Sequence, residues 1–292
     1  MFAWLVLLHG DETFSWTQWT IHPSVLIGCL LWVGAYLYAI GPLRRKYNLS
    51  PEPVEPIQVA SFIGGTVLLF LALNGPLHDL SDSFLFSAHM VQHLIITLLC
   101  PPLWLMALPA WLIRPALRYR PVYAAARTLN NPLVAFAIYN VVFIGWHFPV
   151  LYNWALEHHT AHIVQHTLFI AAATIMWYPA IRPVPELARM EPPVRLLYLF
   201  AFSIPMSIVS ALITLAPDVL YPWYAASPRV FAMSAVEDQQ TGGLIMWVPG
   251  MGLFWIVISI MFFRWSNRED REEATNRELW AQKKEPSHGD GS

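Results

Sequence analysis

Seven long apolar stretches alternate with short polar connections along most of the chain. Each is long enough to cross about 30 Å of hydrocarbon as an α-helix, for which roughly 20 apolar residues suffice. The pattern therefore predicts an all-α integral membrane protein, a bundle of seven transmembrane helices. The stretches lie near residues 22–40, 57–74, 84–108, 131–147, 159–180, 195–216 and 241–263.

The composition supports a membrane protein. Of the 292 residues, 56% are hydrophobic and 12% are charged, whereas about a quarter of the residues are charged in an ordinary soluble domain. We expect an outer N-terminal segment (1–21), a seven-helix transmembrane domain (22–264) and a charged cytoplasmic tail that is partly disordered (265–292). The two cysteines lie inside predicted spans and form no metal or redox motif.

Basic residues and histidines occupy opposite sides of the predicted membrane. All 17 Lys and Arg residues except Arg229 lie on one side, which the positive-inside rule makes cytoplasmic. The N-terminus is then outside and the C-terminus cytoplasmic. All 11 histidines except His288 lie on the outer side. An outer surface rich in imidazole and poor in cations favours a site for a soft or borderline metal, and the net charge of −2 favours lipid over nucleic acid as a partner.

A short motif occurs twice. Residues 89–93 read His-Met-Val-Gln-His and residues 162–166 read His-Ile-Val-Gln-His, at the start of the third and fifth predicted spans. This predicts a parallel repeat of helix hairpins, spans 2–3 matching spans 4–5. Because residues i and i+4 share a helix face, each copy can direct two imidazoles to one place. The predicted metal ligands are His89, His93, His162 and His166.

Other polar or sulfur-bearing side chains map to the same outer level. Carboxylates and further imidazoles near a metal commonly orient its ligands, and thioethers suit Cu(I). Asp238 is also placed to cap the seventh predicted helix. The candidates for additional or supporting roles are His78, His147, His158, His159, Asp79, Glu157, Asp238, Met90 and Met246.

Four segments together resemble the CtaG family of caa3-type cytochrome c oxidase assembly factors. They are residues 87–93, 146–152, 158–166 and 238–247, within a similarity that covers about residues 15–265. The resemblance implies a multi-pass protein of the bacterial cell (inner) membrane that assists the biogenesis of a haem-copper oxidase and is not an enzyme. It also implies oxidase subunits as partners and copper as the metal, bound and delivered in the manner of a chaperone, with the copper donor left open.

Two other functions use the same residues. A zinc-dependent membrane hydrolase would hold Zn²⁺ with the histidines and activate water with Asp238 or Glu157. An electron-transfer protein would ligate a b-type haem with one imidazole from each helix. The metal bound by the purified protein distinguishes these alternatives from copper handling.

Overall fold

The computed structural model describes residues 14–17, 19–50, 53–181, 183–184, 186–187 and 190–284, and over these ranges it is helical with no strand. The bundle helices are α2 (Pro23–Tyr38), α4 (Pro56–Ala72), α6 (Phe86–Leu94), α7 (Cys100–Ala107), α10 (Pro132–His147), α12 (His159–Ile181), α13 (Pro192–Thr214) and α15 (Ala235–Lys284). The shorter helices are α3 (Arg44–Lys46), α5 (Gly75–Ser83), α8 (Ala110–Leu117), α9 (Arg120–Leu129), α11 (Pro149–Glu157) and α14 (Pro222–Ala226), and two π-helical segments are η1 (Ala39–Leu43) and η2 (Ile95–Leu99).

Proline starts many of these helices. It is the first residue of α2, α4, α10, α11 and α13, because its fixed φ suits the first turn and its missing N–H would have no intrahelical partner there. Each of the seven predicted apolar stretches lies on a helix.

Fewer helices than the seven predicted are long and apolar enough to be candidate membrane spans. In the part of the chain that the structure describes, four single helices meet this criterion: Pro23–Lys46, Phe86–Ala107, Pro192–Thr214 and Ala235–Trp280. Two bent pairs, α4 with α5 and α9 with α10, raise the number to six. The predicted fifth span forms α12 but is not among them, since its imidazole and amide side chains lower its hydropathy. The seven-span count, the repeat and the orientation therefore remain predictions.

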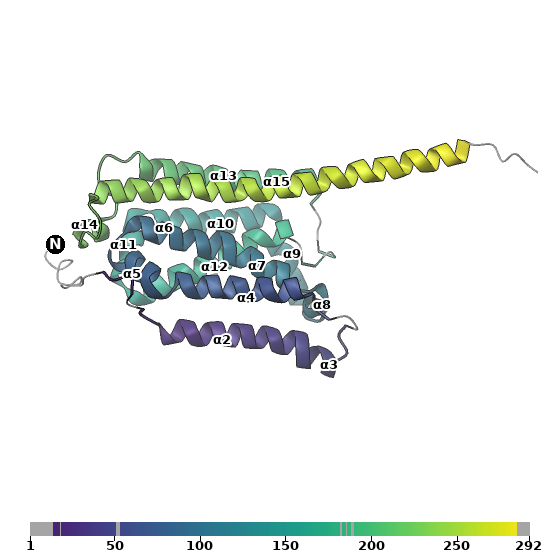
Figure 1. The fold of residues 1–292 in the computed structure, drawn as a ribbon, viewed down its shortest axis with the longest axis horizontal. Coiled ribbons are helices and arrows are strands. Elements are labelled where there is room, and N and C mark those ends of the chain that lie inside the picture. Colours follow the sequence, from purple (N-terminus) through teal and green to yellow (C-terminus); the bar gives the residue numbers. More distant parts are fainter. Residues whose placement is uncertain are drawn as a thin grey trace, which may run out of the picture.

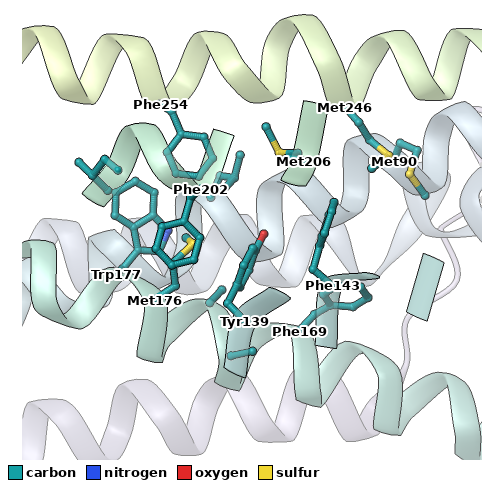
Figure 2. Packing of buried hydrophobic residues seen from close by; sticks show 14 of the residues in the cluster. Met90, Tyr139, Phe143, Phe169, Met176, Trp177, Phe202, Met206, Met246 and Phe254 are labelled. Carbon is teal, nitrogen blue, oxygen red and sulfur yellow. The ribbon is translucent and has the colours of Figure 1, made fainter. Parts of the chain in front are cut away.

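The bundle has two chemically different ends. Figure 1 shows α5, α11 and α14 gathered at one end, which we call the histidine end, and α3, α8 and α9 at the other, which we call the basic end. Between them, α13 and α15 run side by side along one face, and α2 lies at the opposite edge (Figure 1). Aromatic and methionine side chains fill the interior beneath α15 (Figure 2).

Helix α15 extends past the predicted end of the membrane domain. It is continuous from Ala235 to Lys284, well into the predicted tail, and its second half runs beyond the bundle (Figure 1). The rest of that tail, 285–292, and most of the predicted N-terminal segment lie outside the described residues.

Candidate metal centre

The four predicted ligands occupy matching positions on two helices. His89 and His93 are the fourth and eighth residues of α6, and His162 and His166 are the fourth and eighth of α12. All four side chains are buried. Their ring centroids lie 4.3 Å apart within each pair, and 5.4 Å apart both from His89 to His162 and from His93 to His166. We call these four residues the imidazole cluster.

The cluster contains two overlapping groups of possible metal ligands. Nitrogens of His89, His93 and His166 all lie within 4.8 Å of one another. His162 belongs to a second group with His89 and the carboxylate of Asp82, at the same spacing. The structure thus brings the four predicted imidazoles together, and adds Asp82 of α5 at their edge.

Hydrogen bonds fix which nitrogen of His89 carries its proton. Tyr224 donates its hydroxyl proton to the carbonyl of Ser81 at 2.6 Å, so at 2.8 Å from His89 Nδ1 the Tyr224 oxygen acts as an acceptor. The Ser81 carbonyl, 3.3 Å from the same Nδ1, can also only accept. His89 therefore carries its proton on Nδ1, and the lone pair of Nε2 points toward His93, whose Nε2 is 2.8 Å away. This tautomer is the one that a metal ligand at Nε2 requires.

Several nitrogens of the cluster lack partners. His93 Nδ1, His162 Nε2 and His166 Nε2 are buried without a hydrogen bond among the described residues. Leaving a buried polar atom unsatisfied costs about 1–3 kcal/mol, and a metal ion would recover that loss at a ligating nitrogen. The other nitrogen of His162 lies 3.6 Å from Asp82 Oδ2, close enough for this carboxylate to influence how the ring is presented.

A groove gives access to the cluster from the side of α2. It has a volume of about 410 Å³ and lies between α2, α4, α5 and α12. His162 and His166 line its inner part, and His22, His78 and Asp82 line it nearer the histidine end. His22, which precedes α2, stacks edge-on against His78 with ring centroids 4.7 Å apart. Burial lowers the pKa of His22 below its ordinary value of 6.5.

Asp238 holds the helix that carries the first His pair. Its carboxylate accepts hydrogen bonds from the backbone N–H of Phe86 at 2.8 Å, the N–H of Ser87 at 3.1 Å and the Ser87 hydroxyl at 2.6 Å. These are the first two residues of α6, whose terminal N–H groups have no acceptor within the helix. The sequence suggested a cap on the seventh helix or a role at the metal; the structure places Asp238 as a cap on a different helix, α6.

A hydrogen bond between α12 and η2 helps to position the second His pair, His162 and His166. Pro101 and Pro102 have no N–H, so the carbonyl of Thr97 has neither the i+4 nor the i+5 donor of a regular helix. Trp177 of α12 donates its Nε1–H to that carbonyl at 3.0 Å instead. The bond fixes the relative height of the two helices that carry the imidazoles.

The supporting candidates at the groove and in the interior have defined surroundings. His78 lies 3.1 Å from Gln92 Nε2 and 3.4 Å from Asp82 Oδ2, and His159 is exposed at the groove. His147 is buried with its ring centroid 6.2 Å from that of His93. Met90 and Met246 are buried beside a separate cavity that His93 and His147 also line.

Three candidates lie away from the cluster. His158 and Glu157 are exposed, and His158 Nδ1 bonds the carbonyl of Trp154 at 2.9 Å. Asp79 accepts a hydrogen bond from Thr20 at 3.2 Å. None of these three belongs to a candidate ligand group among the described residues.

Sequence reasoning missed two residues at the site, Tyr224 and His22. Asp82 is placed at the outer level by its sequence position, and the structure groups it with His89 and His162. No local pattern connects Tyr224 to His89, which is 135 residues away. His22 belongs to no motif in the sequence.

The fold and the site define a class of protein: a helical membrane protein with a buried imidazole cluster at one end of its bundle. A family model described as "Cytochrome c oxidase caa3 assembly factor" matches residues 34–268. The chain belongs to this family, which confirms the resemblance found in the sequence.

Two curated relatives are mycobacterial proteins described as uncharacterized. They are Mb0105 of Mycobacterium bovis and MT0111 of Mycobacterium tuberculosis, and each is 26% identical over 280 residues. The alignment covers 88% of this chain but 40% of each relative, so the chain spans less than half the length of these proteins. No solved structure matches the chain.

Proposed function

We propose that this protein binds copper in the imidazole cluster and delivers it to a haem-copper oxidase during assembly, in the inner membrane of a bacterium. The observation that carries the proposal is the buried group of His89, His93 and His166, whose nitrogens lie within 4.8 Å of one another. Burying imidazole nitrogens this close together in an apolar interior costs stability unless a bound ion supplies a partner for their lone pairs.

The ligand chemistry favours copper among the metals of the cell. Neutral imidazole binds both oxidation states of copper, and divalent copper stands highest in the affinity order of the first-row metals. The family's role in assembling an oxidase supplies a destination for copper and gives no comparable support to a zinc hydrolase or a b-haem protein.

Delivery requires that the ion also leave the site. The groove beside α2 reaches His162 and His166 and carries further imidazoles at His22 and His78. A donor or acceptor protein could exchange ligands there one at a time, so that copper is never released to water. We propose the groove as the exchange route.

Metal analysis of the detergent-purified protein tests the proposal. Wild type is compared with the quadruple variant His89→Ala/His93→Ala/His162→Ala/His166→Ala and with His158→Ala, a matched control at an exposed histidine outside the cluster. We expect at least one equivalent of copper in wild type and the control, and a loss of at least one equivalent in the quadruple variant.

The same variants are then tested in cells for the copper content and activity of the oxidase. Both should fall with the quadruple variant and stay unchanged with His158→Ala. Unchanged oxidase copper in the quadruple variant, or zinc or haem in place of copper in purified wild type, would contradict the proposal.

A further inference from the structure

A second, smaller cavity lies deeper in the bundle. It has a volume of about 20 Å³ and is enclosed by residues of α6, η2, α10, α12, α13 and α15. Three methionines line it, Met90, Met206 and Met246, together with His93 and His147. Each of these side chains is at least nine-tenths buried. Figure 2 shows the three methionines along the underside of α15, above Phe143 and Phe169. We call it the inner cavity.

Two imidazole nitrogens at the inner cavity have no partner. His147 Nδ1 lies 2.6 Å from the carbonyl of Phe143, which can only accept, so Nδ1 carries the proton and Nε2 has a free lone pair. His147 Nε2 and His93 Nδ1 are both buried without a hydrogen bond among the described residues. Packing alone would favour apolar side chains here, because an unsatisfied polar atom costs about 1–3 kcal/mol.

We propose that the inner cavity is a second metal site, selective for Cu(I). Its ligands are the thioether sulfurs of Met90, Met206 and Met246 and the Nε2 atom of His147. Thioethers are soft ligands that select Cu(I), whereas Mg²⁺, Ca²⁺ and Mn²⁺ prefer oxygen, and no carboxylate lines the cavity. A volume of this size holds about one water-sized particle, which suits a single ion.

His93 connects the inner cavity to the imidazole cluster. Its Nε2 lies 2.8 Å from His89 Nε2 in the cluster, and its unpartnered Nδ1 belongs to a side chain that also lines the inner cavity. A neutral imidazole has one lone pair, so His93 can ligate a metal in only one of the two sites at a time. If the proton of His93 moved from one ring nitrogen to the other, His93 would stop ligating the metal of one site and could ligate the metal of the other. This step rests on the proposed function for the arrival of copper at the cluster.

Each site keeps enough ligands without His93. The cluster retains the group of Asp82, His89 and His162, and the inner cavity retains one imidazole and three sulfurs. The protein should therefore bind two equivalents of Cu(I), with sulfur in the coordination shell of one of them.

Anaerobic titration of the full chain with Cu(I) against a chromophoric chelator, with X-ray absorption of the loaded protein, tests the inner site. The variant Met90→Leu/Met206→Leu/Met246→Leu conserves volume and is expected to fold. It should bind one equivalent fewer than wild type and lose the sulfur scattering. Met176→Leu, a buried methionine outside the cavity, should change neither.

A second variant separates this inference from the proposed function. His89→Ala/His162→Ala/His166→Ala should keep one equivalent with sulfur ligation. If that variant binds as much Cu(I) as wild type while the methionine variant loses one equivalent, the cluster assignment fails and the inner site stands. Absence of sulfur scattering from loaded wild type, or unchanged binding in the methionine variant, would overturn the inner site and leave a cavity that holds water only.

Discussion

At the scale of single residues, Tyr224 determines how His89 presents Nε2 to the cluster. Its hydroxyl donates a hydrogen bond to the Ser81 carbonyl and accepts one from Nδ1–H of His89, which holds the ring with Nε2 directed into the cluster. Outer partners of this kind typically change metal affinity 10- to 100-fold when they are removed.

We therefore expect Tyr224→Phe to weaken copper binding by the cluster about 10- to 100-fold, measured by competition with a chelator of known affinity. The control is Tyr198→Phe, which also removes a buried hydroxyl, one that donates to the Met176 carbonyl at 2.8 Å, but far from the histidines. Equal losses of affinity in the two variants would show that Tyr224 has no special relation to the site.

The sequence predicted some of the residues of the two sites and not others. The repeated His-x-x-Gln-His motif predicted the four clustered imidazoles because their spacing is local to one helix. Tyr224, Met206 and the cap from Asp238 to α6 depend on contacts between residues more than 100 positions apart. Membrane helices are apolar on faces toward lipid and toward protein alike, so the hydrophobic pattern does not reveal which face of a helix meets its neighbours.

At the scale of elements, two glycines let α15 approach its neighbours closely. A Cβ atom at Gly242 would lie 2.3 Å from Cδ1 of Phe86, and one at Gly243 would lie 2.8 Å from the backbone nitrogen of Thr214. Gly242 follows Asp238 by one helical turn, so it faces the same end of α6 that the carboxylate caps. The close approach of α15 to α6 and the capping of α6 by Asp238 therefore depend on each other.

Gly242→Ala should destabilise the protein by about 1–3 kcal/mol through overpacking and weaken copper binding, because displacement of α15 removes Asp238 from α6. Phe86 cannot easily yield, since it is buried and stacked on Tyr221 with centroids 4.6 Å apart. Thermal unfolding in detergent and copper competition are the measurements. Gly252→Ala, on the same helix with no atom within 4 Å of the added carbon, should leave both unchanged; a similar loss there would refute the close-approach explanation.

The extents of the elements were largely predictable. Apolar runs predicted six helices within a few residues, for example 195–216 against the observed Pro192–Thr214, whereas the seventh run, 241–263, is only part of α15, which continues to Lys284. The π-helical segment η2 directly after the first His pair was not predicted, since Ile95–Leu99 reads as an ordinary apolar helix. The bend between α9 and α10 was likewise not predicted, because it lies in a short polar connection.

At the scale of the whole molecule, the histidine end and the basic end should face opposite sides of the membrane. In a background of Cys29→Ala/Cys100→Ala, His158→Cys and Arg118→Cys place single thiols at exposed positions on α11–α12 and α8–α9. An impermeant maleimide should label the first variant in intact spheroplasts and the second only after lysis. The reverse pattern would invert the predicted orientation, and labelling of both in intact spheroplasts would mean that the two ends share one side.

The fixed tautomer of His89 also determines how metal loading responds to protons. Copper that binds Nε2 of this ring finds a lone pair already present, and the proton of His93 can move from Nε2 to Nδ1 without leaving the protein. Metal binding to sites with protonated ligands releases protons, whereas binding through His89 and His93 should release none. Calorimetric titrations with copper in buffers of different ionisation enthalpy should therefore give the same heat, and under the proposed function an exchange of copper at these two rings would leave the local proton balance unchanged.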